Sequence, residues 1–517
     1  MLTRTDSRPH GTQARARPRA VVIGSGFGGL AAAVRLSGKG YQVTVVEKLD
    51  APGGRAYTYH QDGFVFDAGP TLITAPHIFE EVWEAGGGRL EDDVTLKPCD
   101  PFYKIRFNDG DVFTCSGDHQ QMRAEVARIA PGDAAGFERY LEMSKEIYDV
   151  AFDKLAGQPF HSLAFTLANM ADLVRLGGYW SVYQKVSQYF KDPKLRIAFS
   201  FHPLFIGGNP FSTTAFYCLI AHLERTFGVH YAVGGTGALV RGLVSLLERN
   251  GGALRCNSPV RRILTEGDRA CGVELETGET LMADLVVSNV DPATTYGKFL
   301  GHRKRKRWTD RKIAGADYSM SLFVWYFGTD RTYEDIDHHS IVLGPRYKGL
   351  LEDIFDQHHV ADDFSLYLHR PTAHDKTLAP EGCDTFYVLS PVPNLSSGTD
   401  WTTLAEPYRQ RIQDRLEETM MPGLSGHIVS SHLLTPQDFL DRYGSFQGAA
   451  FGMQPKLFQS AWFRPHNRSE EVQNLYMVGA GTHPGAGVPS VLMSAKVVSD
   501  LIPAADELAG ALDGLNA

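Results

Sequence analysis

Residues 20–29 read AVVIGSGFGG, and this stretch decides the fold of the chain. Its first four residues form a continuous apolar run, which is typical of a buried parallel strand, and the run ends directly in a glycine turn. After the turn, an apolar stripe over residues 30–36 predicts a helix, and residues 42–46 predict a second strand. A strand, a glycine turn, a helix and a strand make a βαβ unit. The sequence therefore predicts an α/β domain of the Rossmann type at this end of the chain.

The spacing of the glycines predicts what this domain binds. Gly24 permits a tight turn, Gly26 lets the backbone approach a pyrophosphate, and Gly28, followed by Gly29, lets the helix pack closely on the strand. The phosphates then lie at the positive N-terminus of the helix. Glu47 stands 19 residues after Gly28, where a carboxylate can accept hydrogen bonds from ribose hydroxyls. Because the strand, the helix and the acid accompany the turn, we predict a bound dinucleotide rather than a purely structural turn.

A second glycine motif favours FAD over NAD as this dinucleotide. Gly53-Gly54-Arg55 follows Glu47, and a glycine pair before an arginine lets a guanidinium approach the pyrophosphate from the side opposite the helix. A nicotinamide cofactor must leave after each turnover, whereas a grip from two sides suits a flavin that stays bound. The sequence contains one such dinucleotide fingerprint, so we expect no separate NAD(P)H site.

The C-terminal part of the chain contains a further glycine block. Residues 474–489 read NLYMVGAGTHPGAGVP and predict a buried strand, a glycine turn and a helix that runs to about residue 502. A helix N-terminus at the pyrimidine end of a flavin would stabilise the negative charge of the reduced ring and raise its oxidising power. A helix after Gly234 and strands near 253–256, 272–275 and 285–289 are expected to return the chain to the first domain.

Composition excludes several classes of protein. With 517 residues, of which 43% are hydrophobic and 21% charged, the chain is globular and too long for one ordinary core. A net charge of −9 has the wrong sign for a nucleic-acid binder. The six cysteines form no CxxC pair, which argues against a zinc site, an iron–sulfur cluster and a disulfide framework, and suits a reducing cytoplasm. The sequence contains no uncharged apolar stretch of 18 residues, so we expect any membrane contact to be peripheral.

Longer stretches of the sequence carry a family resemblance. These are VVIGSGFGGLAAAVRL, VTVVEK, PGGRAYTY and GFVFDAGPTLIT near the N-terminus, SVYQKVSQYFKDPKLRIAFSFHPLFIGGNPF, VGGTGALVRGL, APEGCDTFYVLSPVPNL and QSAWFRPHNR in the middle, and NLYMVGAGTHPGAGVPSVLMSAK near the C-terminus. Together they resemble bacterial-type phytoene desaturases, within the wider flavin amine-oxidase-like superfamily, over residues 20–502. The resemblance implies FAD-dependent desaturation of phytoene by successive C–H dehydrogenations to neurosporene, lycopene or both, with hydride passing to flavin N5.

The same resemblance implies an α/β fold in which a discontinuous Rossmann-like FAD-binding domain is joined by a mixed α+β substrate domain and a helical, membrane-associating lid. The FAD-binding domain is expected at 20–95, 233–297 and 450–503, and the substrate-binding domain with its lid at 96–232 and 298–449. Residues 1–19 are expected to form a disordered basic arm, and 504–517 a C-terminal tail. An aromatic, apolar region between Phe160 and Phe216 is interpreted either as an ordinary helical core or as a tunnel wall and a membrane-facing lid.

The resemblance also assigns residues to the cofactor. Those expected at the adenosine and pyrophosphate are Gly24, Gly26, Gly28, Gly29, Glu47, Lys48, Gly54 and Arg55, and Val260 would meet the adenine through its backbone. Those expected around the isoalloxazine ring are Gly69, Pro70, Thr71, Gly479, Gly481, Gly487 and Val488.

A catalytic acid or base is harder to assign. The reaction removes a hydride from one carbon and a proton from its neighbour, and a hydrocarbon has no polar handle, so a long apolar channel must orient it. Some family members have a carboxylate after a Pro-Phe-x-Ser segment, whereas Phe165 stands in that region here. The catalytic residues stay unassigned. Asp153 and Lys154 are weak candidates, because both are more typical of a solvated helix.

Two polar clusters have alternative interpretations. The pairs His338-His339 and His358-His359, with Asp337, Asp362 and Asp363 nearby, are more typical of polar loops than of a metal site, and we expect no metal. The basic run 303–307 either contacts anionic lipid or forms a solvated face.

The expected partners are phytoene and partly desaturated carotenoids, a membrane surface, and oxygen or a quinone as electron acceptor, with no nucleic acid. The expected location is the cytoplasm, in peripheral contact with the inner membrane. Two alternative functions are a later-step carotenoid desaturase or isomerase, and a prenyl-binding escort protein of the same fold without flavin chemistry. The sequence leaves open the number of desaturation steps and the oligomeric state.

Overall fold

The computed structural model describes residues 17–507. Residues 1–16 of the predicted basic arm and 508–517 of the predicted tail lie outside the described residues. At the start of the described chain, Nε of Arg17 donates to the carbonyl oxygen of Gly40 (2.8 Å). Near its other end, the N–H of Ala505 donates to the carbonyl oxygen of Lys39 (3.0 Å). The sequence assigned residues 504–507 to a tail, but this hydrogen bond attaches them to the folded domain.

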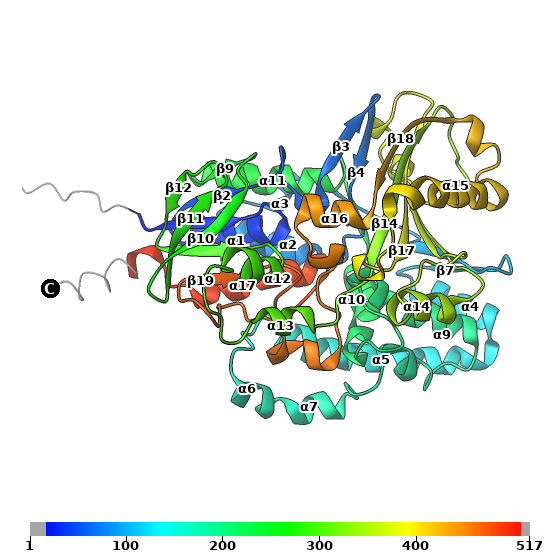
Figure 1. Cartoon of the computed structure of the whole chain (residues 1–517). Coiled ribbons are helices and arrows are strands. Elements are labelled where there is room, and N and C mark those ends of the chain that lie inside the picture. Colours follow the sequence, from blue (N-terminus) through cyan, green and yellow to red (C-terminus); the bar gives the residue numbers. More distant parts are fainter. Residues whose placement is uncertain (1–16, 508–517) are drawn as a thin grey trace, which may run out of the picture.

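The first sheet is the parallel sheet that the glycine turn predicts (Figure 1). Its strands run in the order β19-β13-β1-β2-β9, and every neighbouring pair is parallel. The strands are β1 (Arg19–Ile23), β2 (Gln42–Val46), β9 (Ala253–Arg255), β13 (Leu285–Ser288) and β19 (Leu475–Met477). Apart from Arg19, which the sequence assigned to the disordered arm, all of these residues lie in the three segments that the sequence predicted for the FAD-binding domain.

This sheet is the middle of three layers, because successive side chains of a strand point to opposite faces. Ala20 and Val22 of β1 join the core beneath the helices α1 (Phe27–Gly38), α11 (Thr236–Arg249) and α17 (Val488–Leu501). Val21 and Ile23 face a second core, shared with a small antiparallel sheet. That sheet consists of β10 (Val260–Glu266), β11 (Arg269–Leu275) and β12 (Thr280–Met282).

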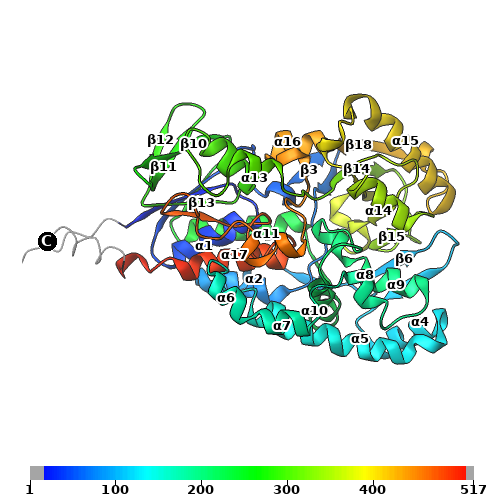
Figure 2. The same ribbon diagram turned by 60° about the horizontal axis from the view of Figure 1, so that its bottom comes forward.

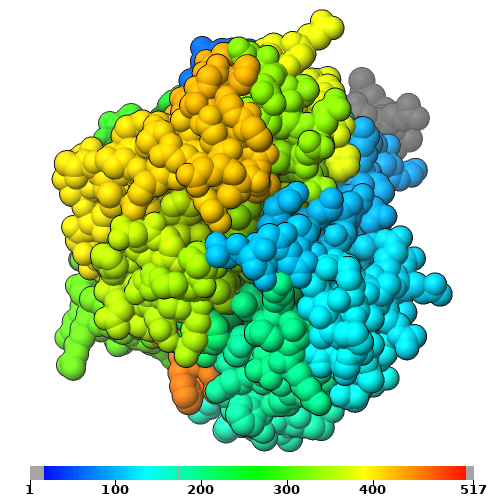
Figure 3. Space-filling model, turned by 90° about the vertical axis from the view of Figure 1, so that its right-hand side faces the viewer, coloured from blue at the N-terminus to red at the C-terminus, as the bar shows by residue number. Residues whose placement is uncertain are grey.

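The second large sheet has the order β18-β14-β17-β16-β15-β6-β7 and is antiparallel except between β15 and β6. Its strands are β6 (Tyr103–Arg106), β7 (Val112–Cys115), β14 (Ser321–Thr329), β15 (His339–Val342), β16 (Leu366–His369), β17 (Asp384–Val392) and β18 (Ile428–Leu434). Helix α15 (Trp401–Thr419) covers one face, where Phe323 packs on Trp401 and Tyr408. Figure 3 shows the β6–β7 segment, in blue, lying between the yellow part of the chain and the cyan helices.

Helices cover the other face of the second sheet and extend along the lower edge of the molecule. They are α4 (His119–Ile129), α5 (Ala134–Ile147) with a π-helical continuation (Tyr148–Lys154), α6 (Leu163–Ala168), α7 (Met170–Arg175), α8 (Val182–Val186), α9 (Pro193–Ser200) and α10 (Leu219–Phe227). In Figures 1 and 2, α6 and α7 lie at the outer edge of this group. The remaining elements are α2 (Pro76–Ala85), α3 (Leu90–Asp93), β5 (Leu96–Pro98), β8 (His230–Ala232), α12 (Pro292–Thr294), α13 (Asp310–Ala314), α14 (Tyr347–Phe355) and α16 (Pro436–Tyr443).

One hairpin of the segment 20–95 contacts the second sheet as well as the first domain. Strands β3 (Thr58–Gln61) and β4 (Phe64–Asp67) pair with each other and pack on the second sheet. The rings of Tyr59 and Tyr326 are 5.5 Å apart, and Phe64 occupies the space above Gly328, where a Cβ would lie 2.5 Å from the Phe64 ring. The hairpin therefore connects the two sheets.

Within the described residues, one helical stretch, Val488–Glu507, is long and apolar enough to cross a membrane, and half of it is buried inside the protein. It contains Lys496 and Asp500 and is therefore not an uncharged apolar stretch. Lys496 Nζ donates to Glu81 Oε2 (2.9 Å), and α17 packs along α1. These contacts are those of a core helix.

Candidate functional site

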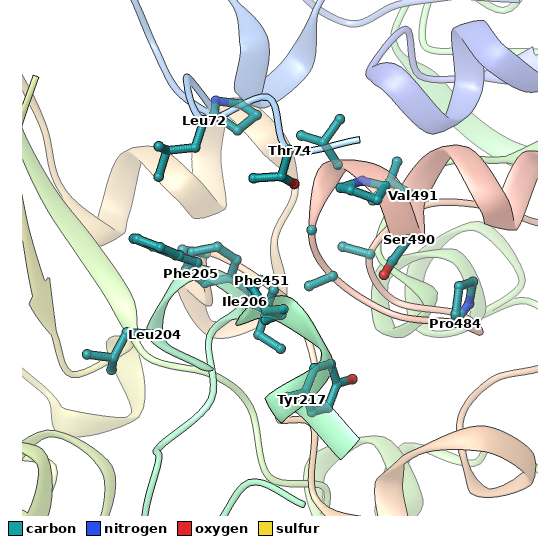
Figure 4. Close-up of a pocket in the computed structure, with 18 of the residues that line it drawn as sticks. Leu72, Thr74, Leu204, Phe205, Ile206, Tyr217, Phe451, Pro484, Ser490 and Val491 are labelled. Carbon is teal, nitrogen blue, oxygen red and sulfur yellow. The ribbon is translucent and has the colours of Figure 1, made fainter. Parts of the chain in front are cut away.

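A cavity of about 680 Å³ lies between the two large sheets, within the size range of small-molecule and cofactor sites. All three segments of the first domain and the helical region contribute to its wall. Figure 4 shows Pro484, Ser490 and Val491 on one side of it, and Leu204 and Phe205 on the other. One end of the cavity is built mainly from backbone and the other from apolar side chains.

Two helix N-termini open onto the backbone end. Helix α1 begins after Gly26 and α17 after Gly487, which has φ +100°, and neither has a side-chain cap among the described residues. The first N–H groups of a helix have no partner within the helix and carry partial positive charge. Gly26, Phe27 and Gly28 of the first turn and Gly487 and Val488 of the second line the cavity. Each of these N-termini fits an anionic group bound at this end of the cavity.

The glycines of the first and last motifs touch one another. A Cβ on Gly28 would lie 3.0 Å from the backbone nitrogen of Gly479, and a Cβ on Gly29 would lie 2.0 Å from the carbonyl oxygen of Gly24. Gly24 itself has φ +92°, and Gly481 leaves no room for a Cβ beside Pro292 (2.1 Å). Side chains at these positions would push the backbone apart, which explains why the sequence needs glycine in both motifs.

Arg55 is aimed at the same end of the cavity. Its Nη2 donates to Ser445 Oγ (2.9 Å), whereas its buried Nε finds no partner within residues 17–507. Burial lowers the pKa of Arg55, and the nearby charge of Asp291 opposes this shift. A buried guanidinium N–H without a partner is unfavourable until an acceptor binds, and a pyrophosphate is such an acceptor. The residues present therefore fit an FAD pyrophosphate.

The residues predicted for the adenosine lie beside the cavity rather than in its wall. Glu47 is buried, and its Oε2 accepts hydrogen bonds from the N–H (2.8 Å) and hydroxyl (2.6 Å) of Ser25. The N–H of Ser258 donates to the Glu47 carbonyl oxygen (2.7 Å), which brings Val260, two residues further, to the same side. Lys48 is exposed and donates to the carbonyl oxygen of Asp441 in α16. The structure thus groups Glu47 and Val260, and turns Lys48 toward α16.

The motif after β4 forms the part of the wall nearest the second sheet. Gly69, Pro70 and Thr71 line the cavity. The hydroxyl of Thr71 hydrogen-bonds the hydroxyls of Tyr387 (2.7 Å) and Tyr367 (3.0 Å). Just before the motif, burial raises the pKa of Asp67 to about 6, and its carboxylate accepts the N–H of Thr236 (3.0 Å) at the start of α11. These contacts fix the motif between the two domains.

Sequence reasoning missed Asn289 and Asp291. Asn289 lines the cavity, and its side chain lies 2.6–2.9 Å from the positions that a Cβ of Gly26 or Gly28 would take. Asp291 is near Arg55 and Arg464, and its Oδ1 caps α12 through the N–H of Ala293 (2.9 Å). Both follow β13 directly. Because ligands of open α/β sheets bind at the carboxyl ends of the strands, the carboxyl end of the predicted strand 285–289, which includes Asn289 and precedes Asp291, was the available signal.

The two weak catalytic candidates do not lie in the cavity wall. Asp153 and Lys154 are exposed, and Lys154 Nζ pairs with Asp172 (3.1 Å), whereas their neighbours Phe152 and Leu155 line the cavity. The π-helical segment turns the charged pair to solvent and the apolar pair inward. Glu224 of α10 is an acid that sequence reasoning missed. It contributes to the wall, and its Oε2 accepts the hydroxyl of Tyr103 (2.8 Å).

The polar clusters also differ from the sequence grouping. His358 and His359 are exposed. The acids near the histidine pairs form salt bridges with basic side chains: Asp337 pairs with Lys104 (2.8 Å), Asp362 with Arg411 (3.0 Å) and Asp363 with Arg346 (2.5 Å). In the basic run, Arg303 pairs with Asp268 (2.8 Å), Arg305 with Asp310 (2.6 Å) and Arg307 with Glu470 (2.7 Å). These pairs favour the solvated-face interpretation of the run.

The apolar end of the cavity opens toward exposed hydrophobic side chains. We call Leu163, Leu167, Val174, Tyr179, Phe458 and Phe463 the apolar rim. Phe458 is 74% exposed, Tyr179 62% and Leu167 59%. Val174, Tyr179, Phe458 and Phe463 also line the cavity, whereas Phe160, Leu204, Phe205 and Phe216 line it further inside. The aromatic region 160–216 thus supplies buried core residues, part of the cavity wall and part of the exposed rim.

The fold and the cofactor end define a flavoenzyme. The profile of the family described as Flavin containing amine oxidoreductase matches residues 27–503, and the chain belongs to this family. Its cofactor is FAD, and it is an FAD-dependent oxidoreductase. Among solved structures, a putrescine oxidase triple mutant matches with a TM-score of 0.64 at 13% identity, covering 94% of this chain and 98% of the other. At that identity the likeness concerns the fold alone.

Relatives of higher sequence identity show to which group within this family the chain belongs. The chain is 50% identical over 490 residues to the phytoene desaturase (neurosporene-forming) of Cereibacter sphaeroides, with 94% of each chain covered. It is 45% identical over 484 residues to the phytoene desaturase (lycopene-forming) of a Paracoccus species, covering 93% of this chain and 97% of the relative. Within the flavin family, the chain belongs to the bacterial-type phytoene desaturases.

Proposed function

We propose that the protein desaturates phytoene in carotenoid biosynthesis, by successive C–H dehydrogenations to neurosporene, lycopene or both. One observation carries the proposal: a single cavity joins a backbone end that fits FAD to an apolar end that opens at an apolar rim. A long hydrocarbon needs such a wall, since burial of apolar surface, at roughly 25 cal/mol per Å², is its main source of binding free energy. The relatives at 45–50% identity are phytoene desaturases by name, which favours this function over a later-step desaturase, an isomerase or an escort protein.

The chain's own residues have defined tasks in this reaction. Bound FAD supplies the hydride acceptor. Leu72, Leu204, Phe205 and Phe451 surround the polyene, exclude water and hold the reacting carbons in place. The first turns of α1 and α17 hold negative charge on the cofactor side.

The test is reconstitution of the purified protein with FAD and phytoene in lipid vesicles, followed by chromatography of the products. We expect polyenes with longer conjugation, with neurosporene dominant after three steps or lycopene after four. Unchanged phytoene in a sample with full flavin content would contradict the proposal. Conversion of neurosporene or ζ-carotene without conversion of phytoene would support the later-step alternative.

We further propose that the apolar rim inserts into the membrane surface, so that the lipid-dissolved substrate enters the cavity directly. Support comes from the exposed rim side chains that also line the cavity. The protein would then be cytoplasmic and peripherally bound to the inner membrane. Phe458→Asp combined with Leu167→Asp is expected to reduce flotation with phosphatidylcholine/phosphatidylglycerol vesicles about tenfold or more.

The matched control is Met282→Asp on β12, which changes another exposed apolar residue (43%) in a strand of the first domain. It should leave vesicle binding unchanged. Equal binding by the rim variant and the wild type would overturn the membrane proposal without affecting the desaturase proposal, because detergent-dispersed phytoene tests the latter separately.

For the electron acceptor we propose oxygen or a membrane quinone. The support is that the sequence contains one dinucleotide fingerprint, which is assigned to FAD, and no second motif for a nicotinamide cofactor. Turnover in the absence of oxygen, with and without an added quinone, distinguishes the two. Turnover that depends on NAD(P)⁺ under both conditions would exclude both.

A further inference from the structure

A buried cysteine and two buried histidines form a cluster that the desaturation reaction does not use. Cys99 follows β5, and His338 and His339 stand at the start of β15. Their exposed fractions are 2%, 6% and 1%. A potential ligand atom of each residue, the Cys99 sulfur and one ring nitrogen of each histidine, lies within 4.8 Å of the other two.

The second sheet brings these residues together. Strand β15 pairs in parallel with β6, which begins four residues after Cys99, and pairs in antiparallel with β16. Its register places His369 directly opposite His339. Since more than two hundred residues separate Cys99 from the histidines, the spacing of the sequence carries no signal for this cluster, and the sequence grouped His338 and His339 with other residues.

Each histidine has one ring nitrogen held and one free. Nδ1 of His338 hydrogen-bonds Nδ1 of His374 (2.7 Å), and Nδ1 of His339 hydrogen-bonds the hydroxyl of Tyr367 (2.6 Å). Across the described chain, Nε2 of both rings is buried and has no hydrogen-bond partner. An orphaned buried nitrogen is unfavourable and asks for an explanation. One nitrogen oriented by an outer partner and the other free is the arrangement of metal-ligating histidines.

We propose that Cys99, His338 and His339 bind one borderline or soft metal ion, with Zn²⁺ the commonest ion for such a donor set. One thiolate sulfur and two imidazole nitrogens suit Zn²⁺ or Cu⁺, whereas Mg²⁺ and Ca²⁺ prefer oxygen ligands. The three ligand atoms lie within 4.8 Å of one another, and binding would draw them to about 2.0–2.3 Å from a common centre. Binding releases the thiol proton of Cys99 to solvent.

Such an ion would stabilise the structure next to the cavity wall. It would tie the chain before β6 to the start of β15, and His339 holds Tyr367, whose hydroxyl contacts Thr71 in the cavity wall (3.0 Å). The site thus supports the wall from behind, away from the reacting atoms. This inference does not rest on the proposed substrate.

Metal content of the full-length flavoprotein tests the proposal. Elemental analysis is expected to give about one zinc or copper per chain, and Cys99→Ser and His339→Gln should each lower this at least tenfold. Cys218→Ser is the matched control, because Cys218 is equally buried (2%) and lies outside the cluster, so it should keep the metal. Flavin absorbance and circular dichroism identify a variant that fails to fold.

X-ray absorption at the metal edge of the wild type keeps the test independent of the variants. One sulfur at about 2.3 Å and nitrogens at about 2.0 Å are expected. A chain that holds no metal and gains none on titration with Zn²⁺ would overturn the proposal, as would equal metal content in all variants or an all-oxygen shell, either of which marks adventitious binding.

Discussion

The two walls of the cavity are built in opposite ways. The cofactor wall, at the end of the cavity formed by 24–29, 53–55 and 479–488, depends on close backbone packing. A Cβ would lie only 2.0–2.9 Å from a neighbouring atom at Gly26, Gly28, Gly29, Gly53, Gly479 and Gly481. The substrate wall, formed by Leu72, Leu204, Phe205, Phe216 and Phe451, presents apolar side chains that several residue types could replace. The first wall depends on backbone geometry and the second on shape and volume, so substitutions should be far less tolerated in the first.

The largest effect is expected on the cofactor wall. Gly29→Ala places a methyl group 2.0 Å from the carbonyl oxygen of Gly24, and the glycine turn cannot move without opening the sheet. We expect destabilisation by about 3 kcal/mol or more and loss of bound flavin. The flavin-to-protein absorbance ratio and thermal unfolding measure this. Gly297→Ala, where nothing lies within 4 Å of the new Cβ, is the control and should keep its flavin.

A second effect is expected where the two walls meet. Burial lowers the pKa of His483 to about 4, and its Nε2 hydrogen-bonds the carbonyl oxygen of Ala156 (3.2 Å). As pH falls from about 6.5 toward 4, the unfolded chain takes up a proton that the folded ring resists, so stability falls, by at most about 3 kcal/mol. The measurement is chemical denaturation of wild type and His483→Gln at pH 7 and pH 5. Glutamine keeps an N–H donor, and the stability difference between the two proteins should shrink at pH 5; a constant difference would contradict the assignment.

A smaller effect is expected on the substrate wall. Leu204→Ala removes apolar contact from the polyene but leaves the glycine motifs intact. We expect kcat/KM for phytoene to fall about tenfold, roughly 1.4 kcal/mol, with flavin content unchanged. Loss of flavin from this variant would show that the two walls are not separable.

The smallest effect is expected outside both walls. Asp153→Asn and Lys154→Ala change exposed side chains on the π-helical segment, and the Lys154–Asp172 pair is a surface pair. Stability should change by less than about 0.5 kcal/mol and turnover not at all. A large fall in turnover at unchanged flavin content would restore one of them as a catalytic candidate.

The contrast between the walls also explains what the sequence could predict. The strands β1, β2, β13 and β19 and the helices α1, α11 and α17 lie within a few residues of their predicted positions, because glycine turns between apolar runs have few structural solutions. Asn289, Glu224 and the Cys99 cluster were missed, since their roles arise only when distant segments meet. The packing of the hairpin β3–β4 on the second sheet was not predicted for the same reason, since the segment 20–95 was assigned as one piece to the FAD-binding domain.

The position of β19 has a consequence for the synthesis of the protein. This strand completes the parallel sheet beside β13, although five of the seven strands of the second sheet, β14 to β18, are translated between the two. At about 5–20 residues per second, β13 waits roughly 10–40 s on the ribosome with its hydrogen-bonding edge uncovered. The Gly479–Gly28 contact forms only after that interval, so a nascent chain cannot yet close around its cofactor. FAD capture must therefore be one of the last events in the making of this enzyme, and chaperone protection of that edge would have to last until then.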